Sequence, residues 1–286
     1  MAANAERLPR RRSGLRRLHP GFRLTLGITV AYLGLIVLLP IAAAFLKLLD
    51  IAPSEIWRIA TSDRALAAYR LSFGLSLAAA LINLAFGTAT AWVMVRYRFP
   101  GRRILDAMID LPFALPTAVA GIALATLYAS HGWIGRPLAM LGVEAAFRPT
   151  GILVALVFVG LPFVVRTVQP ALQDLDPALE EAAASLGASR GQSMRLVVAQ
   201  HILPAALTGF ALSFSRAVGE YGAVIFIAGN IPFVSEIAPL LIVVQLEQYD
   251  YAGATVLAVA MLILSFLLLL LINLLQRWSG NRRLVA

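Results

Sequence analysis

An arginine and a glutamate interrupt a long apolar segment, and they are the first candidates for chemistry in this sequence. Arg216 and Glu220 are the only charged residues within positions 203–230. On a helix, their i,i+4 spacing lets the two side chains pair. Ionisable groups deep in a membrane are costly and usually face a partner or a water-filled path. Two interpretations stay open: a self-neutralised pair that fixes helix packing, or a pair that lines the path of a transported anion.

A second cluster of charge is acidic and lies in a short polar stretch, QDLDPALEEAAASLGASRGQ, at residues 173–192. Four of the fifteen acidic residues fall within eight positions there: Asp174, Asp176, Glu180 and Glu181. Asp176 can cap a helix that begins with Pro177, and Gly187 suits the left-handed position after its last turn. Residues 189–192 read as a capping box that opens a second helix. The pattern predicts a helical hairpin, which is either simply solvated or docks into a groove on a soluble partner.

The sequence offers no motif for catalysis or for metal binding. It has no cysteine, and its three histidines, His19, His131 and His201, stand at no metal-ligand spacing. The one lysine, Lys47, follows no glycine-rich loop, so a phosphate-binding G-x-x-x-x-G-K-[ST] motif is absent. H-E-x-x-H does not occur, and the one stretch that fits G-x-S-x-G, GASRG at residues 187–191, lies between two predicted helices and lacks the strand-to-helix turn that the motif requires. We therefore expect this chain to have no enzymatic activity and no cofactor.

Long uncharged runs supply the elements that must position these residues. The chain is 60% hydrophobic, and its mean hydropathy of +0.82 lies outside the range of soluble domains. Residues 24–46, 71–95 and 251–276 each exceed the ~20 residues that a helix needs to cross the hydrocarbon core. Three further candidate spans are residues 111–130, 149–165 and 203–230. We predict an all-α membrane protein with six transmembrane helices and the acidic hairpin between the fourth and the fifth.

The placement of arginine predicts the orientation, because cytoplasmic loops are enriched in Lys and Arg. With six spans, one side of the membrane holds 17 of the 24 basic residues, the other side holds six, and Arg216 is the last. Both termini and the hairpin are therefore expected in the cytoplasm. The 47–70 and 131–148 loops are expected on the opposite, periplasmic side.

Two charged features near the cytoplasmic side have simple interpretations. Residues 1–21 form a basic segment, which we interpret as a topology signal rather than as a nucleic-acid-binding arm, and we expect it to be disordered or to rest on anionic lipid. Asp106 and Asp110 follow the arginine-rich stretch RYRFPGRR at residues 96–103. We expect both carboxylates to form ion pairs with the arginines of that stretch.

One heptapeptide connects the chain to a known family. EAAASLG at residues 181–187 matches the EAA-x-x-x-G motif of the membrane subunits of ABC importers. From about residue 22 to the C-terminus, the chain resembles the sulfate/thiosulfate permeases, in particular the T-type subunit of their pair. The stretches that carry this likeness are RYRFPGR (96–102), DLPFALPTAVAG (110–121), LPFVVRTVQP (161–170), ALSFSRAVGEYGAVIFIAGN (211–230) and LEQYDYAGA (246–254). The resemblance implies a type I ABC importer permease fold over residues 22–280, with the cytoplasmic hairpin at 170–204 and a tail at 281–286.

The resemblance also implies roles and partners. In that family the hairpin docks into the ATP-hydrolysing subunit and carries its motion to the membrane helices. The implied coupling residues are Glu180, Glu181, Ala182, Ala183 and Gly187. In such a permease, Arg216 and Glu220 would be the candidates to line the translocation path, with the packing interpretation still open. The implied partners are a second, homologous permease subunit, two ATP-binding subunits, a periplasmic sulfate-binding protein and the lipid bilayer of a bacterial inner membrane. ATP hydrolysis would belong to the partner, and no nucleic acid is expected to bind.

Alternatives and one departure from the family pattern accompany this interpretation. A molybdate or tungstate ABC permease would move a similar tetrahedral dianion by the same design. A secondary anion transporter would show an internal repeat and several mid-membrane carboxylates, whereas Glu220 is the one acid clearly placed at mid-membrane. The Leu-Pro pair that usually follows the EAA motif is replaced here by Ala199-Gln200, with Leu203-Pro204 one turn later. We expect docking to survive, and the end of the second hairpin helix is left open.

Overall fold

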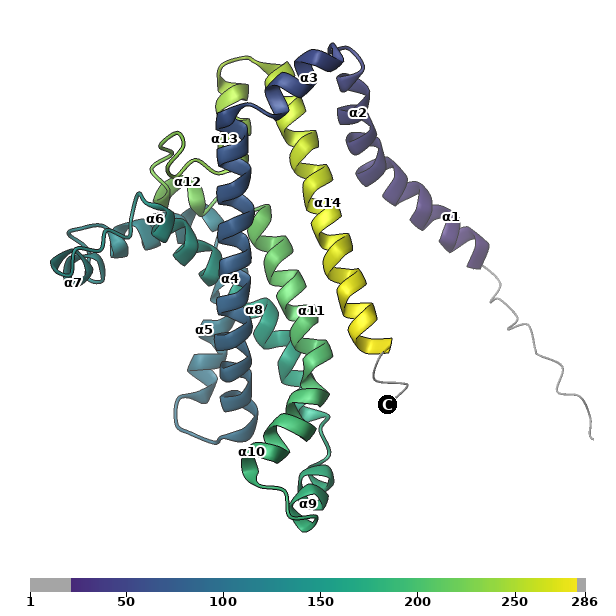
Figure 1. Ribbon diagram of the computed structural model, residues 1–286, viewed down its shortest axis with the longest axis vertical. Helices are drawn as coiled ribbons and strands as arrows, with labels where there is room; N and C mark the ends of the chain where they lie inside the picture. The colour runs from purple at the N-terminus through teal and green to yellow at the C-terminus, as the bar shows by residue number, and fades with distance from the viewer. Residues whose placement is uncertain (1–21, 282–286) are drawn as a thin grey trace, which may run out of the picture. The chain divides into compact units, whose positions relative to one another are not determined.

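The computed structural model describes residues 22–281, and all regular structure in that range is helical (Figure 1). This confirms the predicted all-α class. The chain divides into two units, residues 1–50 and 51–286. The predicted basic segment 1–21 and the tail from residue 282 onward lie outside the described residues.

The first unit contains one apolar helix with a wider, π-helical turn in its middle. Its parts are α1 (Phe22–Leu33), η1 (Gly34–Leu38) and α2 (Leu39–Leu48). Residues 24–48 form a candidate membrane span of 25 residues, in agreement with the predicted span 24–46. No residue of η1 or α2 is buried, so lipid or another protein chain must cover this apolar surface.

The second unit holds the remaining helices. Their bounds are α3 (Pro53–Ala60), α4 (Asp63–Arg96), α5 (Arg102–Ala114), α6 (Thr117–Tyr128), α7 (Gly135–Met140), α8 (Pro149–Gln173), α9 (Pro177–Ser185), α10 (Arg190–Ser193), η2 (Met194–Val198), α11 (Ala199–Val218), α12 (Val224–Ile227), α13 (Ala238–Glu247) and α14 (Tyr251–Asn281). The predicted spans 71–95, 149–165 and 251–276 fall within α4, α8 and α14, each of which is long and apolar enough to cross a membrane. α4 starts earlier than its span because the Ser62 side chain caps it and accepts a hydrogen bond from Ala65 N at 3.4 Å.

The predicted span 111–130 is not one straight helix. Its sequence is divided between α5 and α6, which are bent by 115° at the intervening break. Proline explains the break, because the residue before a proline is pushed out of the helical region of backbone space. Leu115, which precedes Pro116, accordingly has an extended backbone with φ −84° and ψ 136°. The described residues therefore contain five straight candidate spans, or six if the bent pair counts as one.

The predicted span 203–230 begins earlier and ends earlier than the sequence indicated. A continuous helical segment runs from Arg190 through η2 and α11 to Val218, and the chain then turns at Gly219. The second helix of the hairpin therefore has no end of its own: it continues through Pro204 directly into the span. Beyond Gly219, the short helices α12 and α13 replace the remainder of the predicted span.

The core of the second unit lies between α4, α8 and α11, which pack side by side (Figure 1). A β-carbon at Gly209 of α11 would lie 2.8 Å from the Cα atom of Val164 on α8, so only glycine permits this approach. A β-carbon at Gly87 of α4 would lie 2.9 Å from the Cβ atom of the same valine. Ser213 and Ala217 continue the small-residue face of α11, and both are buried. Small residues thus let three helices meet around one valine.

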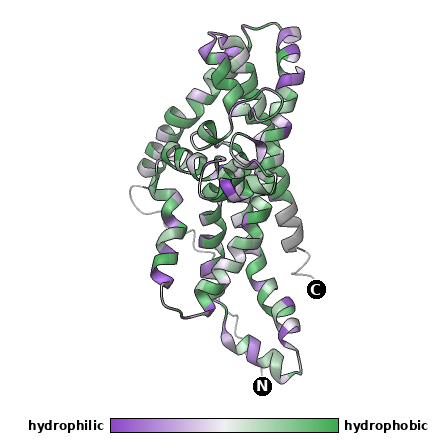
Figure 2. Ribbon diagram, turned by 90° about the vertical axis from the view of Figure 1, so that its left-hand side faces the viewer, coloured by the Kyte–Doolittle hydropathy of each residue, from purple (hydrophilic) through white to green (hydrophobic). Residues whose placement is uncertain are grey.

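The outer surface of the long helices is largely apolar. Figure 2 shows these helices mostly in the hydrophobic colours. Large side chains such as Phe86 on α4 and Phe266 on α14 are exposed to more than half of their possible extent. Apolar surface on this scale marks contact with a membrane or with another protein, and it fits helices that pass through a lipid bilayer.

Candidate functional site

The acidic hairpin forms where its local signals predict it. The Asp176 side chain caps α9 by accepting a hydrogen bond from Ala178 N at 2.9 Å, and Pro177 occupies the first turn. Gly187 follows the helix with a φ of +85°, which is the left-handed conformation that glycine adopts without strain. The start and the end of α9 are therefore both specified within a few residues of sequence.

The second helix of the hairpin begins with the predicted capping box. Gln192 N donates to Ser189 Oγ at 3.4 Å, and Ser189 N donates to Gln192 Oε1 at 2.8 Å. From there α10, η2 and α11 follow one another without a break. Figure 1 shows α9 and α10 at one end of the second unit, beyond the ends of α8 and α11. The hairpin is thus joined to the fifth span by continuous helix.

α9 has no buried residue, although it is a well-capped helix. Of the predicted coupling residues, Glu181, Ala182 and Gly187 are exposed, whereas Ala183 and Glu180 are half-buried. Leu186, which directly precedes the capping glycine, is 89% exposed. A short helix that packs against little of its own chain, and carries an exposed leucine beside alanines, has the surface expected of a docking element.

Glu180 forms an ion pair that sequence reasoning missed. Its carboxylate meets the guanidinium of Arg96 in the last turn of α4. The carbon centre of that guanidinium lies 5.0 Å from the ring centroid of Trp92, one helical turn earlier, in a cation–π arrangement. The i,i+4 spacing of Trp92 and Arg96 was visible in the sequence, but nothing there indicated an acidic partner on a distant helix.

Arg216 and Glu220 form the predicted ion pair, although the helix ends between them. The Glu220 side chain is 2% exposed and that of Arg216 is 33% exposed. Glu220 Oε1 also accepts a hydrogen bond from Ala223 N at 2.7 Å, so this carboxylate holds the turn that follows α11. Within residues 22–281 the structure gives Arg216 no acceptor besides Glu220. The structure therefore pairs a buried carboxylate, Glu220, with a guanidinium, Arg216, that is partly exposed to solvent.

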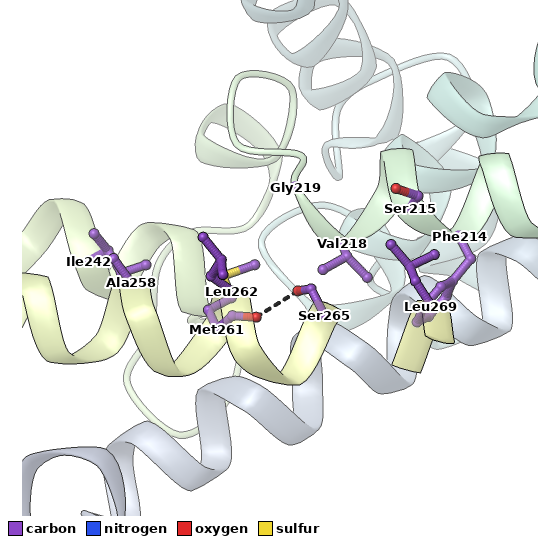
Figure 3. A pocket seen from close by; sticks show the side chains of 10 residues that line it. All are labelled: Phe214, Ser215, Val218, Gly219, Ile242, Ala258, Met261, Leu262, Ser265 and Leu269. Carbon is purple, nitrogen blue, oxygen red and sulfur yellow. Dashed lines mark hydrogen bonds between the residues drawn. The ribbon is translucent and has the colours of Figure 1, made fainter. Parts of the chain in front are cut away.

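A cavity of about 320 Å³ lies between α11, α13 and α14, and neither Arg216 nor Glu220 lines it. Figure 3 shows its lining, which includes Ser215 and Gly219 on either side of the Arg216 position along the chain. The other lining side chains are apolar except Ser265, whose hydroxyl donates to Met261 O at 2.7 Å. Because no charged group lines the cavity, it is unsuited to holding a dianion, which would lose its hydration without compensation.

Arg166 of α8 binds Asp106 and Asp110 of α5, which corrects the expectation that these carboxylates pair with the RYRFPGRR arginines. Its five N–H groups are all used. Two reach the Asp110 carboxylate at 2.8 and 2.5 Å, and the others reach Asp106 Oδ1 at 2.8 Å, Asp106 O at 3.1 Å and Gln169 Oε1 at 2.7 Å. A saturated guanidinium of this kind fixes α5 against α8. Arg166 itself lies within α8.

A second bidentate clamp lies at the start of α4. Arg64 Nε and NH2 donate to the two oxygens of the buried Glu236 carboxylate, each at 2.7 Å. Ser72 Oγ accepts a hydrogen bond from Ala238 N at 2.7 Å and so holds the start of α13. Arg64 was predicted to lie in the external 47–70 loop, and no local pattern pointed to a partner 172 residues away. Among the residues described, no group of three or more His, Cys, Asp or Glu could hold a metal ion.

Comparison with known proteins gives a consistent picture. Residues 83–285 match the family described as binding-protein-dependent transport system inner membrane component. The chain is 53% identical over 252 residues to the sulfate transport system permease protein CysT of a Synechocystis species, with 88% of each chain covered. It is 46% identical over 267 residues to the protein of that name from Escherichia coli, with 93% of this chain and 96% of the relative covered.

Solved structures resemble the fold at low sequence identity. A bacterial ABC transporter involved in the import of the acidic polysaccharide alginate superposes with a TM-score of 0.74 at 15% identity, covering 89% of this chain and 94% of that chain. The same kind of transporter in complex with an alginate pentasaccharide-bound periplasmic protein also gives 0.74, at 16% identity, covering 90% and 94%. Likeness at this level of identity concerns the arrangement of helices alone.

Proposed function

Because this chain belongs to the family of binding-protein-dependent transport system inner membrane components, we propose that it is the membrane-spanning subunit of an ATP-driven ABC importer for sulfate or thiosulfate. The observation that carries the proposal is 53% identity, over 88% of the chain, to a sulfate transport system permease. That alignment is too extensive to be limited to one motif. The multi-pass apolar helices support a location in a membrane, which for this class is the bacterial inner membrane.

The proposed complex contains a second, homologous permease subunit, two ATP-binding subunits and a periplasmic sulfate-binding protein. The described chain supports a need for partners, because a single copy leaves the hairpin uncovered and its cavity between α11, α13 and α14 has no charged lining. One structural relative, the alginate transporter, is known in complex with a ligand-bound periplasmic protein. This chain would then form part of the translocation path, while ATP hydrolysis takes place in the partner.

Coupling is proposed to run through α9. Its exposed face carries Glu181, Ala182 and Gly187, with Ala183 partly covered beside them. The small alanines let a helix approach closely, and the glutamate offers an acceptor to the ATP-binding subunit. Closing of the ATP-binding dimer would displace the hairpin, and continuous helix would carry that displacement into α11. The path would then face the two sides of the membrane alternately.

The path itself is proposed to pass Arg216. Its guanidinium is half-open, and the described chain satisfies it through Glu220 alone. A guanidinium already paired with a buried carboxylate attracts a dianion only weakly, because the two charges nearly cancel. Weak attraction suits a site that must admit sulfate and release it again. High-affinity, selective binding of the anion would take place in the periplasmic binding protein.

Co-purification and uptake test this function. A tagged copy of the chain, expressed with its neighbouring subunits, is expected to bring down an ATP-binding subunit and a second permease subunit. Uptake of labelled sulfate should require ATP and should be reduced by unlabelled thiosulfate. Stronger competition by molybdate than by sulfate or thiosulfate would favour a molybdate permease, and uptake independent of ATP would favour a secondary transporter.

The orientation stays a prediction, with both termini and the hairpin in the cytoplasm. Cysteines introduced at Ser62 and Gly142 should react with an impermeant thiol reagent added to intact cells. A cysteine at Ser189 should react only after the membrane is opened. Labelling of the Ser189 variant in intact cells would reverse the arrangement.

A further inference from the structure

We propose that the ion pair between Arg96 and Glu180 makes α4 move together with the coupling hairpin. This inference rests on the proposed function and adds positioning residues to it. The guanidinium NH2 of Arg96, in the last turn of α4, meets Glu180 Oε1 in the first turn of α9. Within residues 22–281, this is the one ion pair that connects a side chain of α9 to a membrane span.

Apolar packing does not hold α9 against α4. No residue of α9 is buried, and a hollow of about 330 Å³ opens at the junction. Its lining includes Trp92 of α4, Glu180 and Ala184 of α9, and Met194 of η2. Dispersion contacts are lost across such a gap. The ion pair therefore bridges a junction that side chains leave unfilled, and it is the contact that can transmit a displacement there.

Arg96 is directed toward Glu180 by its own helix. Its guanidinium carbon lies 5.0 Å from the ring centroid of Trp92, which precedes it by one turn. The two charged side chains are 26% and 29% exposed, so the pair is screened less than a pair on an open surface. A guanidinium restrained by an aromatic ring loses little freedom when it meets the carboxylate. The pair is consequently suited to keeping a fixed geometry while the hairpin moves.

The pair adds a third connection between the hairpin and the three-helix core. The chain itself links α9 to α8 on one side and, through α10 and η2, to α11 on the other. The π-helical turn η2 interrupts regular α-helix on the second route, and such turns often mark places where helices adjust. Arg96 gives α4 a direct link that avoids η2. All three core helices would then respond to the same displacement of α9.

The test uses the complete transporter in lipid vesicles, with sulfate-loaded binding protein outside and ATP available to the ATP-binding subunits. Three quantities are measured: the amount of ATP-binding subunit that co-purifies, the rate of ATP hydrolysis, and the sulfate taken up per ATP hydrolysed. The variants are Arg96→Gln, Glu180→Gln and the charge swap Arg96→Glu with Glu180→Arg. Arg98→Gln is the matched control, because Arg98 is exposed and has no ionic partner among the described residues.

Each single variant should bind the ATP-binding subunit as the wild type does but should lower uptake per ATP at least about fivefold, the lower bound of typical coupling between sites. The charge swap should restore uptake per ATP, whereas Arg98→Gln should leave all three quantities unchanged. The proposal is overturned if the single variants keep full uptake per ATP, if they lose the ATP-binding subunit, or if the swap fails to restore uptake. Failure of the wild type to retain an ATP-binding subunit would instead contradict the proposed function.

Discussion

The three-helix core and the hairpin are held in shape by opposite means. Around Val164, the helices α4, α8 and α11 approach through glycines and bury a continuous apolar cluster. The hairpin buries nothing in α9 and is shaped by Asp176, Gly187 and the capping box at 189–192. The core thus has its stabilising contacts within the chain. The hairpin has a well-defined backbone but an uncovered surface. We expect another subunit to cover that surface.

Substitutions in the core and substitutions in the hairpin should therefore have different effects. A change in the core should lower the amount of folded protein, because buried contacts supply most of the free energy of folding. A change that alters the exposed docking surface of the hairpin should lower association with the ATP-binding subunit while the protein stays folded in the membrane. The following substitutions test that separation.

The largest effect is expected at Arg216 and Glu220. Arg216→Met or Glu220→Gln leaves one charge without its partner, and breaking a buried pair in this way costs about 3–5 kcal/mol. Each single variant should therefore reduce the amount of folded protein in the membrane, as measured by quantitative immunoblotting and detergent-stable purification.

The double variant at these two positions separates packing from transport. With no charge left unpaired, the amount of folded protein should recover. Sulfate uptake should not recover, because the proposed path has lost its half-open guanidinium. Full uptake by the double variant would show that the pair serves helix packing alone.

A smaller loss is expected at Arg166, which differs from Arg216 in having all its donors used. Arg166→Met leaves Asp106 and Asp110 without a cation, but both carboxylates are 48% exposed and water can solvate them, so the loss should be about 1–3 kcal/mol in total. The thermal midpoint of the purified protein should fall, with uptake per folded complex unchanged. Arg103→Gln, an exposed arginine on the same helix α5 as the two aspartates, is the control. A loss of uptake per folded complex in Arg166→Met would assign Arg166 to the path.

The hairpin should respond to Gly187→Val in the other way. A β-carbon in the left-handed conformation costs roughly 1 kcal/mol or more, and the strain is confined to the turn after α9. The amount of membrane protein should be normal, whereas co-purification of the ATP-binding subunit and sulfate uptake should fall together. Gly191→Val is the matched control, because Gly191 lies in a helix with open space around it. Undiminished association in the Gly187 variant would remove the hairpin from the docking surface.

The smallest effect is expected at an ion pair that belongs to neither region. In α3, Arg58 donates to Glu55 at 2.8 and 2.5 Å, and this hydrogen bonding holds the pKa of Glu55 below its ordinary value of 4.5. A lowered pKa in the folded state means that any stabilisation is present above pH 4.5 and is lost as the pH falls through the lowered value. Both side chains are open to solvent, so Glu55→Gln should leave the folded amount and uptake unchanged at neutral pH. A measurable loss would mean that another subunit covers α3.

Local patterns predicted the hairpin well because its determinants are neighbours in sequence. Asp176, Gly187 and the capping box each act over two to four residues, and the structure contains all of them. The apolar spans were visible for a similar reason, since hydropathy is a property of a contiguous run. The same averaging failed at Gly219, because the mean hydropathy of residues 203–230 stays high although the helix ends at Val218.

Tertiary partners were beyond the reach of these patterns. Asp106 and Asp110 are close in sequence to several arginines, yet they bind Arg166 from 60 and 56 residues away. Glu180 was assigned to docking by its place beside the EAA motif, whereas its carboxylate is engaged by Arg96 from 84 residues away. In each case the choice of partner depends on which helix ends come together, and no local spacing records that.

The uninterrupted helix from Arg190 to Val218 has a mechanical consequence. Its backbone is pressed against α8 at Gly209, which would serve as the fulcrum of a lever. At 1.5 Å per residue, the arm from Gly209 to Arg190 is about 28 Å and the arm to Arg216 is about 10 Å. A lever of these proportions in which η2 keeps its shape turns a sideways movement of about 3 Å at the hairpin into about 1 Å in the opposite direction at Arg216, and bending at η2 would reduce that transfer. A large displacement of the hairpin outside the membrane would thus produce only a small displacement of Arg216 within it.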